Sequence, residues 1–171
     1  DQRLQLNIAC QGRHVATAEL GLELAGSGKL EDQLQVADSR RNQRDQSYAI
    51  PVGKSSRAVD RCQELTLLLT ETATPGREVL VVVRVFDEGV AFRYILPKQA
   101  ALDDFAITDE LTRWRFPPEA TAYVLPLASF QTSYETYYEK QTLRTLPADR
   151  LFGLPLLMQL PPAAEKPLWL A

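Results

Sequence analysis

The stretch at residues 79–97, VLVVVRVFDEGVAFRYILP, constrains the fold of this chain more than any other. Two runs rich in Val, Phe, Tyr and Ile flank the polar connection Asp87-Glu88-Gly89. Such residues fill a half-buried pleated surface well, and a short connection that contains glycine is typical of a hairpin. We expect Gly89 to supply a positive φ at this turn. The stretch therefore predicts two antiparallel strands at the centre of a β-sheet core.

The two arms of this hairpin differ in pattern. The first arm, residues 79–86, is apolar at odd and even positions alike except at Arg84, which is typical of a strand covered on both faces. The second arm alternates, with Phe92 and Tyr94 on one side and Ala91 and Arg93 on the other. Because the stretch contains no nucleophile, no histidine and no metal-ligand spacing, we interpret it as scaffold.

The rest of the chain consists of short candidate strands between turn signals. No long segment has an apolar period of 3.6, and the 11 prolines are spread widely. This pattern predicts an all-β fold, an antiparallel β-sandwich with few or no helices. The expected strands are residues 4–9, 14–18, 20–24 (with Gly21 as a bulge), 64–70, 107–116, 121–125, 154–160 and 168–171.

Three further segments carry weaker signals. Residues 38–46 are almost without apolar side chains, which favours a solvated loop or an edge segment. Residues 99–105 have the composition for one helical turn. Residues 161–166 are expected to form the loop between the last two strands.

Composition excludes several function classes. The length of 171 residues indicates one ordinary domain, or one module of something larger, and the net charge is −3. Arg40, Arg41 and Arg44 form only a short basic group among polar residues, so we expect no nucleic-acid partner. No apolar run reaches the roughly 18 residues of a transmembrane helix.

Common catalytic and metal motifs are missing. His14 is the only histidine and no GxSxG is present, so a serine triad fails. Cys10 and Cys62 form no CxxC, and a zinc site would need more histidines. The sequence leaves open whether these two cysteines are buried thiols or form one disulfide. No carboxylate pair stands out as a glycosidase dyad.

The stretch at residues 129–140, SFQTSYETYYEK, is the most unusual in composition. If it is extended, Ser133, Glu135, Tyr137 and Glu139 face one way, and Tyr134, Thr136 and Tyr138 the other. Tyrosines stack on sugar rings and also hydrogen-bond through their hydroxyls. A carboxylate among them suits Ca²⁺, but this ion takes six to eight oxygens, so one glutamate is a fraction of a site.

Three segments in order resemble glycoside hydrolase family 97. The segment RVFDEGVAFRY at residues 84–94 is similar to the family's RVFNDGVAFRY-type hairpin. FPPEATAY at residues 116–123 resembles its FPEGATAW-type segment, and SYETYY at residues 133–138 its SYE-x-x-Y stretch. Together with the strand segments around Leu20 and Leu65, the resemblance covers most of the chain.

The resemblance implies a fold, a parent enzyme and a metal ligand. The family comprises exported bacterial α-glucosidases and α-galactosidases, with an N-terminal β-super-sandwich like that of galactose mutarotases, a catalytic (β/α)₈ barrel and a small C-terminal β domain. This chain is similar to the first domain, residues 1–171, truncated at its C-terminal end. It would hold no catalytic residue, and a periplasmic or secreted parent would supply the barrel. In the family, the N-terminal domain lends one carboxylate to an active-site Ca²⁺, which by position implies Glu135, with Glu139 as the alternative.

Two other functions stay open. One is a stand-alone carbohydrate-binding module with Tyr134, Tyr137 and Tyr138 as its substrate-binding platform. The other is a mutarotase-like epimerase, which is disfavoured because such enzymes use an acid/base pair that usually includes histidines. The sequence leaves glucoside against galactoside specificity, and retention against inversion, undecided.

Overall fold

The all-β prediction is confirmed. The computed structural model describes residues 3–161 and 167–171, and contacts divide the chain into two compact units. The first comprises Asp1–Leu6 and Glu19–Arg113, and the second Asn7–Ala18 and Trp114–Ala171. Within the described residues the only helix is the short 3₁₀ turn η1 (Leu143–Thr145). The strands are β1 (Gln5–Cys10), β2 (Arg13–Glu19), β3 (Leu22–Leu24), β4 (Gly28–Leu30), β5 (Leu34–Ala49), β6 (Arg57–Glu71), β7 (Glu78–Val85), β8 (Val90–Ile95), β9 (Ile107–Glu110), β10 (Arg113–Arg115), β11 (Thr121–Val124), β12 (Pro126–Leu127), β13 (Glu139–Thr142), β14 (Leu151–Phe152), β15 (Leu157–Leu160) and β16 (Leu168–Leu170).

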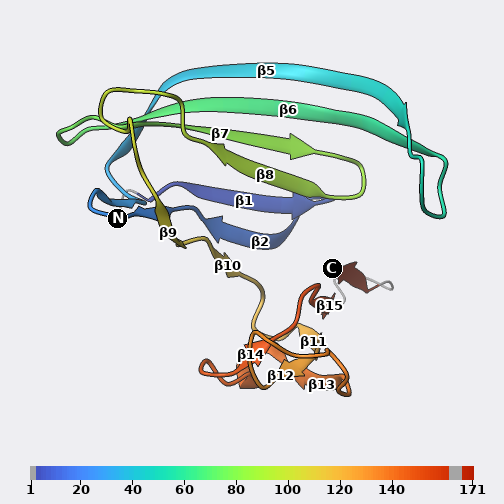
Figure 1. Cartoon of the computed structure of the whole chain (residues 1–171). Coiled ribbons are helices and arrows are strands. Elements are labelled where there is room, and N and C mark those ends of the chain that lie inside the picture. The colour runs from blue at the N-terminus through green and yellow to red at the C-terminus, as the bar shows by residue number, and fades with distance from the viewer. Residues whose placement is uncertain (1–2, 162–166) are drawn as a thin grey trace. The chain divides into compact units, whose positions relative to one another are not determined.

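The predicted hairpin is the pair β7–β8 in the largest sheet. This antiparallel sheet has the order β5-β6-β7-β8 (Figure 1). In β7, Val79, Val81, Val82 and Val83 are all buried, so both faces of the arm are covered as expected. The arm β8 alternates half-buried and exposed residues, which also agrees with its pattern.

Gly89 does not have the predicted positive φ. A four-residue connection, residues 86–89, joins the arms, and the Phe86 N–H donates to the Gly89 carbonyl oxygen at 2.8 Å. Four-residue hairpin loops are mostly built on type I turns, which need no left-handed residue. The prediction for Gly89 was wrong because it assumed the shortest connection.

The polar run at residues 38–46 is strand, so the loop interpretation is wrong and the edge interpretation is confirmed. It lies inside the 16-residue β5, which pairs along its whole length with β6 and ends the sheet. Nearly every residue of β5 is exposed. An edge strand with two solvated faces has no need of apolar side chains, which explains why the composition resembled a loop.

A second sheet in the first unit has the order β4-β3-β9. Gly21 precedes β3 and is not the expected bulge, because the register irregularity of this sheet falls at Glu23/Leu24. A Cβ at Gly21 would lie 2.7 Å from the Cβ of Glu31 and 3.2 Å from that of Leu111. The Gly21 N–H donates to the Tyr94 hydroxyl at 2.9 Å, and burial raises the pKa of Tyr94. A glycine is needed at position 21 because Glu31 and Leu111 approach the backbone closely there, and not because the strand has a bulge.

The expected helical turn at residues 99–105 is also wrong. Gln99 and Leu102 instead form an isolated bridge. The Gln99 side chain accepts from the Glu78 N–H and donates to the Glu78 carbonyl, both at 2.8 Å. Its amide thus takes the place of a neighbouring strand at the start of β7.

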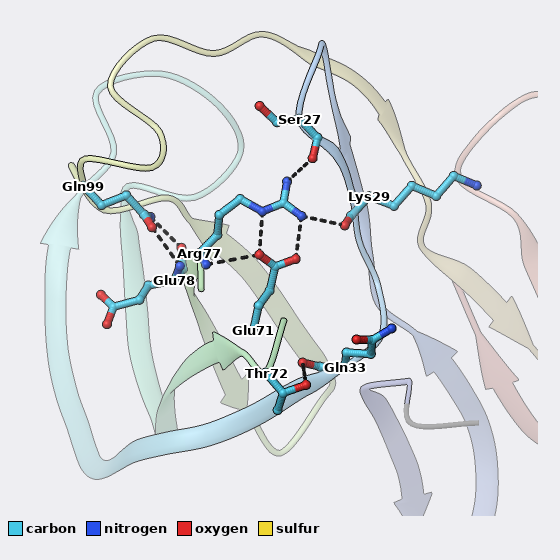
Figure 2. Close-up of polar contacts among 8 residues, drawn as sticks. All are labelled: Ser27, Lys29, Gln33, Glu71, Thr72, Arg77, Glu78 and Gln99. Carbon is cyan, nitrogen blue, oxygen red and sulfur yellow. Dashed lines mark hydrogen bonds and ion pairs between the residues drawn. The ribbon is translucent and has the colours of Figure 1, made fainter. Parts of the chain in front are cut away.

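Arg77 joins two turns of the first unit (Figure 2). Arg77 is only 5% exposed and forms a bidentate ion pair with Glu71. Two further guanidinium N–H groups donate to the carbonyl oxygens of Ser27, in the β3–β4 turn, and of Lys29, in β4. A buried arginine whose guanidinium makes four hydrogen bonds holds these two segments together.

The second unit has a separate core. Its main sheet has the order β13-β11-β15-β16, and Ala122, Val124, Met158 and Leu160 bury one face. A smaller sheet of this unit has the order β12-β14, and the sheet β1-β2-β10 has most of its residues in this unit. The expected strand at residues 107–116 is interrupted after Glu110 and becomes β9 and β10. The expected loop at residues 161–166 lies almost wholly outside the described residues.

Candidate functional site

The tyrosine-rich stretch is a loop. Residues 128–138, which we call the tyrosine loop, connect β12 to β13 and include no strand. Tyr134 has a φ of 60°, a left-handed conformation that an extended strand cannot contain. The expected alternation of Ser133, Glu135 and Tyr137 against Thr136 and Tyr138 is therefore wrong.

The three candidate sugar-binding tyrosines are all exposed, but they do not form one surface. Tyr134 is 52% exposed, Tyr138 63% and Tyr137 91%. The Tyr134 ring lies against Gly153, where an added Cβ would be 3.1 Å from its Cε1 atom. Among the described residues no ring contact joins any two of the three. They are separate aromatic contacts on one loop.

The two candidate metal ligands have different surroundings. Glu139 begins β13, and its Oε1 lies 3.2 Å from the Arg150 Nη2. The Gln141 amide also donates to Glu139. Glu135 is exposed, and in the part of the chain that the structure describes it has no hydrogen bond or ion pair. Of the two carboxylates, Glu135 is the one free to bind a cation.

Within the part of the chain that the structure describes, acidic side chains do not gather into a complete Ca²⁺ site. The described residues contain no group of three or more His, Cys, Asp or Glu that could bind a metal ion. Because Ca²⁺ takes six to eight oxygens, Glu135 fits the ion only as one ligand of a site completed elsewhere.

A polar network on the large sheet was not predicted from the sequence. Arg44 of β5 lies 3.1 Å from Asp60 of β6, and Arg84 of β7 lies 2.7 Å from Glu64 of β6. A hydrogen bond from Gln46 lowers the pKa of Asp60, and the two arginines act in the same direction against partial desolvation. The four charged residues share one face only because of the register, which no spacing within one strand reveals.

The network surrounds the Cys62 side chain. This thiol is 4% exposed, and burial, followed by the charge of Asp60, raises its pKa. A raised pKa makes a thiol a poor nucleophile, so Cys62 is structural. Both Cys62 and the exposed Cys10 are free thiols, and His14 is exposed and bonded to Thr17 at 2.9 Å.

These features define an all-β antiparallel domain whose tyrosine loop carries an exposed carboxylate, Glu135, without a partner among the described residues. The chain belongs to the glycosyl-hydrolase 97 N-terminal family, whose model matches residues 1–170. No curated protein matches it. The described residues contain no helix with the length and apolar character needed to cross a bilayer.

Solved structures agree with this assignment. A glycoside hydrolase family 97 enzyme from Pseudoalteromonas sp. strain K8, in complex with panose, matches with a TM-score of 0.83 and 25% identity over 93% of this chain and 24% of that one. A glycoside hydrolase family 97 enzyme from the same strain, in complex with acarbose, matches with a TM-score of 0.82 and 25% identity over 92% of this chain and 24% of that one. A beta-arabinopyranosidase shares the fold at a TM-score of 0.79 and 24% identity, over 90% of this chain and 26% of its own. The chain thus spans about a quarter of the length of these structures.

Proposed function

We propose that this chain is the non-catalytic N-terminal β-sandwich of an exported α-glycosidase. It packs on the catalytic barrel of the same polypeptide, forms part of the active-site wall and contributes one Ca²⁺ ligand to oligosaccharide hydrolysis. The family match over residues 1–170 supports the domain assignment, and the complexes of the similar enzyme with panose and acarbose support an oligosaccharide substrate. Export places the parent in the periplasm or outside the cell.

Glu135 is the residue that we assign to the cation. The observation that carries this choice is its exposed carboxylate, which has no partner among the described residues, whereas Arg150 neutralises Glu139. A bound Ca²⁺ would polarise an oxygen of the substrate as a Lewis acid. The role of this chain is to present Glu135 from a loop held at both sides, at Tyr134 and at Glu139.

Replacing each glutamate in the parent enzyme tests this assignment. We expect Glu135→Gln to weaken Ca²⁺ binding at least about tenfold, because an amide keeps the shape of the ligand but loses its charge. The matched control, Glu139→Gln, removes the same charge four residues later and should leave Ca²⁺ affinity nearly unchanged. Calorimetric Ca²⁺ titration and activity against Ca²⁺ concentration measure both. Equal affinity of Glu135→Gln and wild type would exclude the role.

The substrate class is the less constrained part of the proposal. An α-glucoside or an α-galactoside is expected from the sequence resemblance, while one structural neighbour is a beta-arabinopyranosidase. Assay of the parent on the matching nitrophenyl glycosides separates these substrates.

The exposure of the three tyrosines favours a second candidate, autonomous carbohydrate binding. Tyr137, at 91% exposure, would be the main contact. Calorimetry of residues 1–171 with maltooligosaccharides, with Tyr137→Ala as the comparison, tests it. Binding that Tyr137→Ala abolishes would support a carbohydrate-binding module.

A further inference from the structure

Strand β6 extends well beyond its partner β7. On one side β5 pairs with all of β6, from Glu71 to Arg57. On the other side β7 pairs only as far as Gln63, which lies opposite Val85. The chain then turns back into β8, and Figure 1 shows the β5–β6 hairpin continuing past this turn. In the part of the chain that the structure describes, no second strand pairs with β6 over residues 57–62.

The direction of the backbone groups in this segment follows from bonds at the two ends of β6. The Glu71 N–H donates to the Arg77 carbonyl on the β7 side at 3.0 Å. The Ser56 carbonyl accepts from the Ile50 N–H on the β5 side at 2.9 Å. Alternate residues of an antiparallel strand point their N–H and C=O groups the same way. The register of β6 has no bulge on its own side, so odd-numbered residues face β7 and even-numbered residues face β5.

Arg57, Val59 and Arg61 therefore direct their backbone groups to a side without a strand, which we call the open edge. A groove of about 460 Å³ runs beside it, lined by Val59, Arg61 and the turn residues 86–91. Unpaired strand edges are the usual template for addition of another strand.

The side chains around the open edge indicate the chemistry of an occupant. Val59 is 62% exposed and Val85 48%, so apolar contact is available. Arg61 is paired with Asp45 across the β5–β6 ladder at 3.2 Å. Asp87 and Glu88 are exposed, and among the described residues neither has an ion pair. The groove therefore has two carboxylates to offer a cation.

We propose that the open edge is the docking site for an extended strand of the same polypeptide, from outside residues 1–171, that carries an apolar and a basic side chain. The strand continues the line of β7 and pairs with Arg57, Val59 and Arg61. The same polypeptide is the source because relatives with this fold continue for about three more times its length, and a linked segment binds at high effective concentration. The inference rests on the proposed parent enzyme only for that additional polypeptide.

Residue-resolved amide hydrogen exchange of the parent enzyme tests the proposal with an internal control. The amides of Ala58, Asp60 and Cys62 face β5 and should exchange slowly whether or not the groove is filled. The amides of Val59 and Arg61 should be equally slow only when a strand occupies the open edge. If the amides of Val59 and Arg61 exchanged fast while those of Ala58, Asp60 and Cys62 exchanged slowly, the proposal would be overturned.

Two substitutions sharpen this experiment. Val59→Pro removes an N–H that points to the groove, and proline is tolerated on a strand edge, so Arg61 should exchange at least about tenfold faster while Asp60 stays protected. Ala58→Pro, the matched control, removes an N–H that points to β5 and should expose Asp60 as well. An Arg61 amide that Val59→Pro leaves protected would contradict strand addition.

Charge reversal tests the chemistry of the occupant. Asp87→Lys with Glu88→Lys should also release the Arg61 amide, whereas the same change at the exposed Asp103 and Asp104 should not. Protection that depends on protein concentration would assign the groove to a second copy and overturn the same-polypeptide source. None of these readouts uses Ca²⁺ or activity, so failure here is distinct from failure of the Glu135 assignment.

Discussion

At the scale of single residues, the glycines show what local sequence could and could not predict. The turn motif predicted a positive φ for Gly89. Gly89 has no positive φ, and the space around its Cβ position is open. Gly21 was expected to be a bulge, yet it is needed because Glu31 and Leu111 approach its backbone closely. A sequence motif predicts local conformation. The crowding of Gly21 comes from residues 10 and 90 positions away in the sequence, so it can be seen only in the folded structure.

Alanine at these two positions should therefore have opposite effects. Gly21→Ala puts a Cβ 2.7 Å from the Glu31 Cβ and is expected to destabilise the chain by about 1–3 kcal/mol. Gly89→Ala meets nothing within 4 Å and should be neutral or slightly stabilising. Urea denaturation of both variants measures the difference. If Gly89→Ala proved the more harmful, the turn geometry described above would be wrong.

Arg77 is a second residue whose importance is invisible in the sequence. Arg77→Gln leaves the Glu71 carboxylate, 9% exposed, without its cation, at an expected cost of about 3–5 kcal/mol. Arg144→Gln breaks an ion pair with side chains 66% and 57% exposed and should cost at most about 1 kcal/mol. Arg77→Lys should recover only part of the loss, because an ammonium cannot form the paired contacts. Similar unfolding midpoints for Arg77→Gln and Arg144→Gln would refute this ranking.

At the scale of elements, β7–β8 was predictable because its apolar pattern is also its burial pattern. β5 was only half predictable, since an exposed edge strand and a loop select the same polar side chains. For the tyrosine loop the error was the opposite one: Tyr and Thr favour strands, but the segment is a loop in which Tyr134 has a left-handed conformation. The composition of a segment predicts whether it is exposed to solvent. Whether an exposed segment is a strand depends on its backbone pairing with a neighbouring strand.

The charges of β5 have a testable consequence. Arg40 and Arg41 are exposed on the outermost strand, where charge opposes pairing with another molecule. Arg40→Val with Arg41→Val should produce concentration-dependent association, detected by light scattering or sedimentation velocity. Lys54→Val with Lys98→Val removes equal charge outside any strand edge and should leave the chain as dispersed as wild type. Association of both variants alike would point to net charge instead of the edge.

At the scale of the whole molecule, sequence and structure together define a family and a fold. The ordered motifs were sufficient for the family. The choice of Glu135 over Glu139 as the proposed metal ligand depends on the structure, since only the fold brings Arg150 to within 3.2 Å of Glu139. The open edge of β6 could not be predicted, because it is a difference in length between two neighbours of one strand.

Stability should fall in acid partly through Asp60. Its pKa is below the ordinary value of 3.8 in the folded chain, so its contribution is complete above the unfolded pKa and is lost as pH falls through the folded one. Asp60→Asn should therefore be less stable than wild type near neutral pH, with a difference that shrinks below about pH 4. The exposed Asp149→Asn serves as the control. A constant difference across this range would show that Asp60 does not act through its charge.

The two contacts that bracket Glu135 have a consequence for cation binding. Tyr134, directly before it, rests on Gly153, and Glu139, four residues after it, is tied to Arg150. Four residues span at most about 14 Å, so the carboxylate explores a short radius around β13. Much of the entropy that a free loop would lose on closing around an ion has therefore been removed in advance. Lengthening the tether between Tyr134 and Glu139, with every ligand atom intact, should therefore weaken Ca²⁺ binding at the proposed site.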